Sequence, residues 1–325
     1  GIAQKYECFT PQKSDPARPY NELIEYIKEK EINCVFVGNE QALSDGIADE
    51  LEAVGIPVIG PSKQAAQIES SKVFSKYLMK KYGVPTADFA VFSDFQEALT
   101  YLETSKYPAV IKADGLAAGK GVIIAADIRE AQDALKLIFL DKKFGSAGNQ
   151  VIIESFLKGE EASVFAFSDG EHFVSTVFAQ DHKAIYDGDK GPNTGGMGAF
   201  APVDKFARLK EKVDQTIFQP IFDGMRNEGM PFKGVLFAGL MIDGDDVNVI
   251  EFNCRLGDPE TEVILPLLDI SFSNICRAII NKTIDQLQLK YNREYAVTVV
   301  SASQGYPDTF EKGNPITIKP EIAQY

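Results

Sequence analysis

The chain has 325 residues and a formal net charge of -14, because 33 Lys and Arg residues stand against 47 Asp and Glu residues. A chain this acidic lacks the basic excess that binds nucleic-acid phosphates or anionic membrane surfaces, so we expect neither partner. Its longest apolar stretch, Gly234–Ile242, is far shorter than the roughly 20 residues that span a bilayer. Scattered cysteines and the lack of a signal-peptide pattern favour a reduced, cytoplasmic protein, and two histidines are too few for a His-rich metal site.

The first part of the chain alternates helix and strand. Helical spacing predicts helices over Tyr20–Lys30 and Ala42–Val54, and β-rich runs predict strands over Ile32–Val37 and Ile56–Ile59. Strand, helix and strand with short connections form a parallel βαβ unit, as in Rossmann-like domains. Because residues 1–19 contain no recognisable strand, we expect this domain to be incomplete.

Mixed helix and strand patterns continue to the end, which predicts an α/β protein with an α+β insertion. A helix is predicted over Ser62–Lys81, and a long functional loop over Ala179–Ala199. The other predicted strands are Phe89–Phe92, Pro108–Asp114, Val122–Ala126, Gln150–Glu154, Glu161–Phe167, Phe173–Phe178, Val235–Ile242, Val247–Glu251 and Ala296–Ser301. The other predicted helices are Phe95–Glu103, Arg129–Phe139, Phe206–Asn227 and Glu260–Ile280.

A glycine-rich turn, Gly115–Gly121, joins two of these strands. Its spacing matches neither a P-loop nor a dinucleotide fingerprint, because a strand follows it and no Ser or Thr follows Lys120. Glycines let backbone N–H groups approach phosphate oxygens, and Lys112 and Lys120 can neutralise their charge. The alternative is an ordinary hairpin with a solvated lysine.

Carboxylates follow two later strands. Glu154 ends an apolar strand, where it could meet an adenine edge, and Glu161 lies seven residues later, where it could accept from ribose hydroxyls. The alternative is a strand that ends in solvated charged residues. Glu251 and Asn253 alternate along a strand and therefore share one face, where hard oxygen ligands suit Mg²⁺. Arg255 falls on that face and could hold a transferring phosphoryl group, although a polar edge-strand face is the alternative.

Together these stretches resemble the ATP-grasp ligases, and within that superfamily the phosphoribosylamine–glycine ligase (glycinamide ribonucleotide synthetase) family. The resemblance is carried by Ile111–Val122, Gln180–Lys183, Gly191–Ala199, Glu251–Arg255 and Gly257–Glu260. It implies an ATP-grasp fold with an N-terminal βαβ domain (1–62), a central domain (63–84 and 154–288), a small lid domain (85–153) and a partial C-terminal domain (289–325).

The resemblance also implies a reaction. Glycine would be phosphorylated by ATP to glycyl phosphate, and 5-phosphoribosylamine would then displace phosphate to give glycinamide ribonucleotide, the second step of de novo purine synthesis. Such phosphoryl transfer needs positioning and charge rather than an enzyme nucleophile. Another carboxylate–amine ligase, or an idle ATP-binding module of a larger purine enzyme, remains an alternative, and fusion to other purine-pathway domains is compatible with the resemblance.

Site residues follow from the same resemblance. Those implied to contact ATP are Lys72, Lys112, Ala117, Ala118, Gly119, Lys120, Gly121, Glu154, Ser155, Phe156, Leu157 and Glu161. Those implied to face the two substrates are Asp181, Lys183, Asn193, Thr194, Gly195, Gly196, Met197, Arg255, Gly257, Asp258 and Glu260. Glu251 and Asn253 would hold Mg²⁺ or Mn²⁺, and Arg255, Lys112 and Asp258 would act in catalysis.

Overall fold

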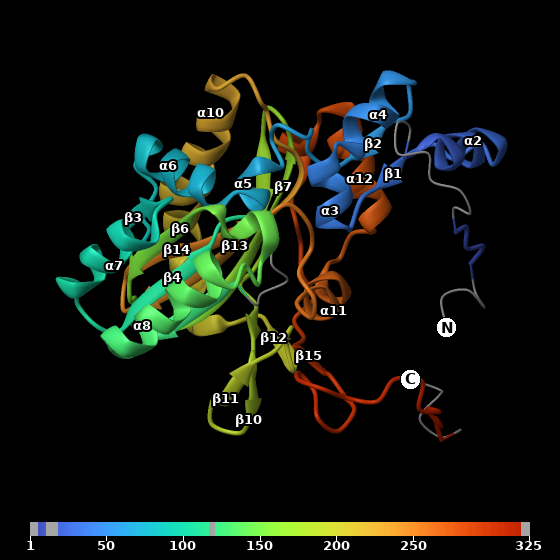
Figure 1. The fold of residues 1–325 in the computed structure, drawn as a ribbon. Coiled ribbons are helices and arrows are strands. Elements are labelled where there is room, and N and C mark those ends of the chain that lie inside the picture. The colour runs from blue at the N-terminus through green and yellow to red at the C-terminus, as the bar shows by residue number, and fades with distance from the viewer. Residues whose placement is uncertain (1–5, 11–18, 117–120, 320–325) are drawn as a thin grey trace.

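The computed structural model describes residues 6–10, 19–116 and 121–319, and its elements are labelled in Figure 1. Four residues of the predicted glycine loop, Ala117, Ala118, Gly119 and Lys120, lie outside the described residues. None of the helices in the described part of the chain has the length and apolarity needed to cross a membrane.

The N-terminal unit contains the predicted parallel strand pair. After α2 (Asn21–Glu29), β1 (Val35–Phe36) runs parallel to β2 (Val58–Ile59). Between them the chain forms two helices, α3 (Glu40–Asp45) and α4 (Ile47–Ala53), so the prediction of a single helix was wrong. The break lies at Gly46, whose φ of 99° belongs to the left-handed region that favours glycine.

A four-stranded antiparallel sheet forms the centre of the molecule. Its order is β14 (Asp246–Asn253), β13 (Lys233–Asp243), β7 (Glu160–Asp169) and β8 (Phe173–Ser175). All four strands were predicted, and they pair as two antiparallel hairpins, β7 with β8 and β13 with β14. Successive residues of β7 face opposite sides: Val164 and Ala166 pack in one core cluster, and Phe165 and Phe167 pack in another.

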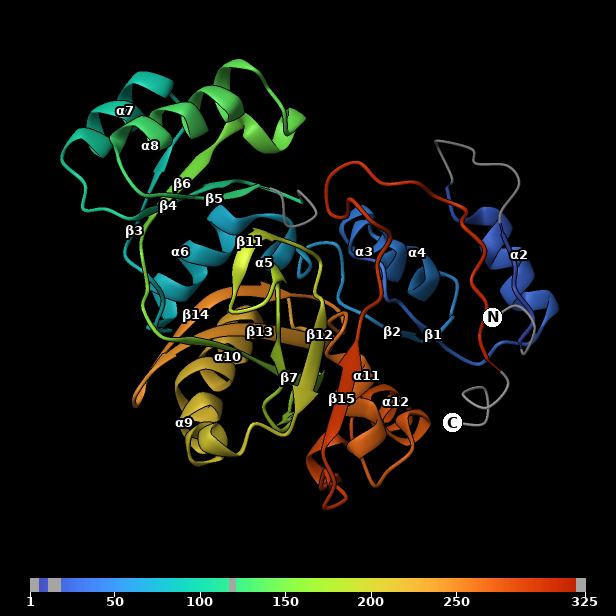
Figure 2. The same cartoon turned by 90° about the horizontal axis from the view of Figure 1, so that it is seen from below.

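Helices cover both faces of this sheet (Figure 2). One cluster includes the run η3 (Asp204–Leu209), α9 (Lys210–Val213), η4 (Asp214–Phe218) and α10 (Gln219–Asn227), which matches the helix predicted there. The other includes α11 (Thr261–Ile264), η5 (Leu265–Leu267), α12 (Phe272–Asn281) and η6 (Ile284–Gln286). The prediction of one helix over Glu260–Ile280 was wrong, because the backbone of Leu268 and Ser271 is extended and the Ser271 hydroxyl caps α12.

A second antiparallel sheet forms a smaller unit with its own core. Its order is β3 (Phe89–Phe92), β6 (Val151–Ser155), β4 (Ala109–Ala113) and β5 (Val122–Ala125). The helices α7 (Phe95–Glu103) and α8 (Ile128–Leu135), the latter continued by η1 (Lys136–Leu140), cover one face of it, and η2 (Gly145–Asn149) leads into β6 (Figure 2).

The region predicted as one long loop contains short strands instead. These are β9 (Gln180–Asp181), β10 (Ala184–Tyr186), β11 (Lys190–Asn193) and β12 (Gly198–Ala201). The last strand, β15 (Ala296–Val299), pairs with β12, so residues distant in sequence complete this layer. The loop prediction was wrong because strands of two to four residues, interrupted by glycines, are too short for a period-2 pattern to show.

The helix predicted over Ser62–Lys81 also divides, into α5 (Gln67–Ser70) and α6 (Lys72–Tyr82). Ser71 is extended (φ −134°), and its hydroxyl accepts a hydrogen bond from the N–H of Phe74 at 3.1 Å. This N-cap starts α6 at Lys72, so Lys72 and Lys76 lie one turn apart on the same face of the helix.

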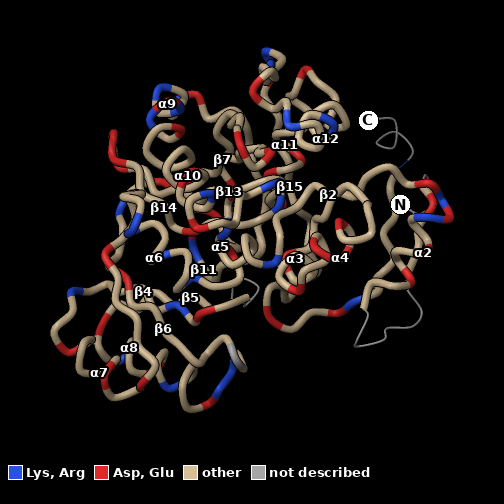
Figure 3. Tube along the Cα trace, turned by 90° about the horizontal axis from the view of Figure 1, so that it is seen from above, with Lys and Arg blue, Asp and Glu red and all other residues tan. Residues whose placement is uncertain are grey.

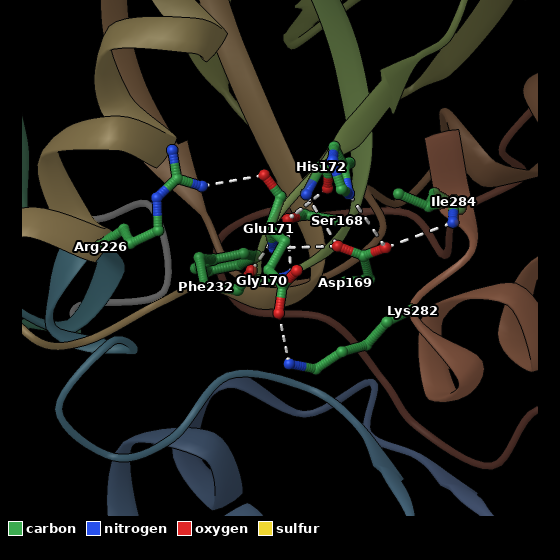
Figure 4. Close-up of polar contacts among 9 residues, drawn as sticks. All are labelled: Ser168, Asp169, Gly170, Glu171, His172, Arg226, Phe232, Lys282 and Ile284. Atoms are coloured by element: carbon green, nitrogen blue, oxygen red, sulfur yellow. Dashed lines mark hydrogen bonds and ion pairs between the residues drawn. The ribbon is translucent and has the colours of Figure 1, made fainter. Parts of the chain in front are cut away.

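The buried carboxylate of Asp169 stabilises the turn between β7 and β8 by hydrogen bonds (Figure 4). Its Oδ1 accepts hydrogen bonds from the N–H groups of Glu171 and His172, at 2.9 and 2.8 Å. Its Oδ2 accepts a 3.2 Å hydrogen bond from the N–H of Ile284, in the chain that follows α12. One side chain therefore joins the central sheet to the helices that cover it.

We predict that Asp169→Ala lowers the free energy of unfolding by about 3 kcal/mol, because it leaves the buried N–H of Ile284 and two N–H groups of the turn without their shared acceptor. Urea unfolding followed by circular dichroism measures this. Asp133→Ala is the matched control. That carboxylate is 76% exposed and, within the described part of the chain, pairs with Lys136 alone, so we expect a change within about 0.5 kcal/mol. Equal effects of the two variants would contradict this role of Asp169.

Candidate active site

A cavity of about 460 Å³ lies between the smaller sheet, α6 and the central sheet. Most of the predicted site residues that the structure describes line it: Lys72, Lys112, Gly121, Glu154, Ser155, Phe156, Leu157, Glu161, Asp181, Lys183, Asn193, Thr194, Gly195, Glu251, Asn253, Arg255, Gly257, Asp258 and Glu260. Gly196 and Met197 do not line it and lie directly behind Gly195 in the chain. Residues from six separate stretches of sequence therefore meet in one place.

One end of the cavity is basic. The buried carboxylate of Glu154 lies between two buried lysines: Lys112 Nζ is 3.0 Å from its Oε1, and Lys76 Nζ is 3.0 Å from its Oε2. Lys112 also donates to the carbonyl oxygen of Ile250 at 3.3 Å, where a bulge in β14 opposes Gly239 and Leu240 of β13. Lys76 was missed by the sequence analysis, although its spacing of four residues from Lys72 was a usable signal.

Lys72 completes the basic end. Its Nζ donates to the carbonyl oxygen of Gly115 at 2.7 Å, directly before the undescribed part of the glycine loop. Burial lowers the pKa of Lys72, and nearby Lys112 lowers it further, although the carboxylate of Glu251 opposes this. Basic groups that are already desolvated and crowded gain strongly when an anion arrives between them.

Apolar side chains form the wall next to this end. They come from α6, both strands of the glycine hairpin, the segment after β6, and the strands β13 and β14. They comprise Met79, Val110, Val122, Ile124, Phe156, Leu157, Met241, Ile250 and Phe252. The N–H of Ser155 already donates to the carbonyl oxygen of Asp88 at 2.9 Å, so that backbone donor is used within the fold. An apolar slot beside three lysines is suited to a planar base that carries phosphates.

Glu251 and Asn253 face the cavity from the end of β14. The amide nitrogen of Asn253 donates to the carbonyl oxygen of Phe252 at 2.8 Å, which orients the amide and leaves Oδ1 as the atom that a metal ion would meet. Among the described residues, no group of three or more His, Cys, Asp or Glu side chains is arranged to hold a metal. One carboxylate and one amide oxygen fit Mg²⁺, which keeps water and phosphate oxygens as its other ligands.

Arg255 is held between two carboxylates. Its Nε lies 3.6 Å from Glu40 Oε2, and a terminal nitrogen lies 3.7 Å from Glu69 Oε1. Glu69 is buried, and its Oε2 accepts a 2.6 Å hydrogen bond from the N–H of Cys254. Burial raises the pKa of Glu69 to about 7, although Arg255 opposes the shift. Neither carboxylate was assigned from sequence, and Glu40 extends the site into the N-terminal unit.

The far end of the cavity gathers Asp181, Lys183, Glu161 and Glu260. Lys183 Nζ donates to Glu161 Oε2 at 3.1 Å. Burial raises the pKa of Asp181, and burial together with Asp181 raises the pKa of Glu260, whose Oε1 accepts from Ser163 at 2.8 Å. Burial alone would lower the pKa of Lys183, but Asp181, Glu161 and Glu251 outweigh it and raise the pKa. This end therefore suits an ammonium group beside a carboxylate.

Two short segments bring these groups together. Thr194 donates its hydroxyl to the carbonyl oxygen of Lys183 at 2.8 Å and accepts from the N–H of Gly196 at 3.0 Å. The N–H of Gly195 donates to the hydroxyl of Tyr306 at 3.1 Å, so the C-terminal segment steadies the same loop. Gly196 touches the ring of Pro259 so closely that a Cβ would lie 2.4 Å from its Cδ.

Figure 3 shows acidic and basic residues interspersed over the whole described trace. In the cavity they are sorted instead: lysines surround Glu154 at one end, and carboxylates surround Arg255 and Lys183 at the other. Such sorting suits a ligand or ligand pair with phosphates at one end and a cationic group at the other.

Two family models match the chain. Phosphoribosylglycinamide synthetase, N domain, matches residues 1–69, and Phosphoribosylglycinamide synthetase, ATP-grasp (A) domain, matches residues 70–261. The crystal structure of phosphoribosylamine–glycine ligase from Thermotoga maritima aligns with a TM-score of 0.76 at 38% identity, covering 84% of this chain and 69% of that one.

Curated relatives of similar sequence indicate the same family. The phosphoribosylamine–glycine ligase of Leptospira interrogans (strain Fiocruz L1-130) is 47% identical over 300 residues, covering 92% of this chain and 70% of the relative. The bifunctional purine biosynthetic protein purD of Dictyostelium discoideum is 48% identical over 311 residues, covering 88% of this chain and 38% of the relative. The chain thus spans about two thirds of a single-function relative and little over a third of a fused one.

The fold and the cavity are those of an ATP-grasp ligase. The chain belongs to the phosphoribosylglycinamide synthetase family. The predicted fold class, family, ATP-dependent ligase class and place in purine biosynthesis are therefore confirmed. The predicted domain boundaries and the roles of single residues remain predictions.

We predict that Gly196→Ala destabilises the protein by about 3 kcal/mol, because its φ of +125° and the nearby Pro259 ring both exclude a Cβ. Gly195→Ala is the matched control, since its Cβ would meet only the Tyr306 hydroxyl at 3.4 Å. Thermal and urea unfolding of both variants measure the difference. Similar stabilities would show that the contact between these two loops is not tight.

Proposed function

We propose that this cavity joins glycine to 5-phosphoribosylamine at the expense of ATP. A glycine carboxylate oxygen attacks the γ-phosphorus as its bond to ADP breaks, which gives glycyl phosphate. The amine nitrogen then attacks the acyl carbon, the bond to phosphate breaks, and the amine loses a proton. The products are glycinamide ribonucleotide, ADP and phosphate.

Support comes first from the shape and charge of the nucleotide end. The apolar slot formed by Met79, Leu157 and Phe252 is suited to adenine, and Lys72 and Lys112 are suited to the phosphates. We assign the ribose hydroxyls to Glu161, which holds Lys183 and so would lie where the nucleotide end meets the acidic end. We expect the glycine loop, with Gly121 at its described end, to cover the phosphates.

Glu251 and Asn253 would hold Mg²⁺, or Mn²⁺, between the nucleotide and the substrates. When bound, the ion would neutralise charge on the transferring phosphoryl group. Arg255 is planar and remains charged, so it can stabilise charge that develops on the same group. The ion pairs with Glu40 and Glu69 hold the Arg255 guanidinium group at this position in the cavity.

The acidic end is suited to glycine. The carboxylates of Asp181 and Glu260 would pair with the glycine ammonium, which is the counter-charge that these crowded carboxylates need. Asn193, Thr194 and Gly195 on one loop, and Gly257 and Asp258 on the other, are placed around the space left for the amine. Closing this space would protect glycyl phosphate from water.

The observation that carries the proposal is a single cavity that joins Lys72 and Lys112, Glu251 and Asn253, and Asp181 and Glu260. We further infer a reducing, cytoplasmic setting, which the free thiols of Cys8, Cys34, Cys254 and Cys276 support. We also infer that this chain can be part of a polypeptide with other purine-pathway domains, which the bifunctional and trifunctional relatives support.

The test is ADP formation with ATP, Mg²⁺, glycine and freshly generated 5-phosphoribosylamine, each omitted in turn. The proposal requires ADP to depend on both glycine and the amine, with glycinamide ribonucleotide formed in equal amount. A requirement for another acid or amine would support a different carboxylate–amine ligase. ATP binding with no turnover under any combination would support an idle module.

We predict that Glu251→Gln lowers kcat by about a hundredfold to a thousandfold, because the phosphoryl group loses charge stabilisation. Glu262→Gln is the control, since that side chain is exposed on α11 and we expect its kcat to stay within about twofold of the unaltered chain. Steady-state kinetics across a range of Mg²⁺ concentrations measures both. Wild-type kcat in Glu251→Gln would contradict the metal role.

A further inference from the structure

One buried lysine on α6 has no part in the function proposed so far. Lys76 is 2% exposed, and its Nζ lies 3.0 Å from Glu154 Oε2 and donates to Thr86 Oγ1 at 2.7 Å. The Thr86 hydroxyl in turn donates to the carbonyl oxygen of Val249 at 2.7 Å. Lys76 is thus fixed on two sides within the wall of the cavity.

This lysine changes the charge that the site presents to a ligand. Lys112 and Glu154 alone would be a neutral pair, whereas Lys76, Glu154 and Lys112 together carry one positive charge. Each lysine occupies a different oxygen of the carboxylate. Because Lys76 takes one of them, Glu154 no longer fully neutralises Lys112.

We propose that Lys76 is a positioning residue for the nucleotide: it neutralises Glu154 and so leaves the charge of Lys112 available to the polyphosphate. The inference rests on the proposed function in taking ATP as the ligand. Lys76 itself, committed to Glu154 and Thr86, acts through Lys112 and does not need to touch a phosphate.

The stability cost of this lysine supports a role beyond packing. Burial lowers the pKa of Lys76 to about 8, although Glu154 opposes the shift. Taking a lysine ammonium group out of water is expensive, and packing alone gives no reason to place a charge at this position. The Lys76 Nζ also lies 5.9 Å from the centre of the Phe89 ring, against which an apolar side chain would pack well.

Calorimetric titration with Mg-ATP and with AMP, without glycine or amine, tests the proposal. We expect Lys76→Met to weaken ATP binding by about tenfold and AMP binding by no more than about twofold, because only ATP carries the polyphosphate. Lys76→Arg keeps the charge and should bind ATP within about threefold of the unaltered chain.

Lys80→Met is the matched control. Lys80 lies one turn further along α6, is exposed, and its Nζ lies 5.8 Å from the centre of the same Phe89 ring. It should bind both nucleotides as the unaltered chain does. Equal losses of ATP and AMP binding in Lys76→Met would indicate a packing role, and no loss of either would remove the role altogether; both results overturn the proposal.

The double variant Lys76→Met with Glu154→Gln keeps the test decisive if Lys76→Met folds poorly. Without the carboxylate, Lys112 regains its full charge, so the ratio of ATP to AMP affinity should return toward that of the unaltered chain. A ratio that stays low would overturn the proposal. Because these titrations omit both substrates, an enzyme that binds ATP but makes no ligation product would contradict the proposed function and leave this inference standing.

Discussion

The site depends on one buried carboxylate shared by two lysines. Glu154 lies on the smaller sheet, as does Lys112, but Lys76 comes from α6 and Lys112 also reaches the carbonyl oxygen of Ile250 on the central sheet. These contacts join the two sheets at the place where the cavity opens between them. Removing Glu154 would leave two buried lysines without their shared counter-charge, which is costly in a low-dielectric interior. The geometry of the basic end therefore follows from electrostatic balance as much as from apolar packing.

The rest of the cavity extends this sorting of charge. Toward the acidic end, Arg255 is bracketed by Glu40 and Glu69, and Lys183 is surrounded by Asp181 and Glu161. Glu251 and Asn253 lie between the two ends. A nucleotide tail, a divalent cation and an amino acid could thus meet in line, each facing its counter-charge. This is the arrangement that phosphoryl transfer to a carboxylate needs, because the enzyme supplies position and charge instead of a nucleophile.

Much of this arrangement could be predicted from sequence, since several motifs are local. Glu251 and Asn253 share a face simply because they alternate on a strand, and the glycine hairpin follows from its two flanking β-rich runs. Contacts between distant segments could not be predicted from local patterns. The pairing of β12 with β15 and the contact between Gly195 and Tyr306 each join segments about a hundred residues apart. The helix breaks at Gly46 and Ser71 were missed because the helical spacing of apolar residues continues through both positions. At each of them a capping residue ends or starts a helix, and this local effect decides the boundary against the apolar pattern. Lys76 was missed because a lysine on a helix is usually solvated, and only the fold shows that Glu154 lies opposite it.

The measurement that most directly tests the account uses glycine labelled with ¹⁸O in its carboxylate. The account predicts that the phosphate released with glycinamide ribonucleotide carries one ¹⁸O atom, because a glycine oxygen attacks the γ-phosphorus and leaves with it when the amine displaces phosphate. Mass spectrometry of the phosphate decides this. Phosphate without the label, formed together with the ligation product, would contradict a glycyl phosphate intermediate at this site.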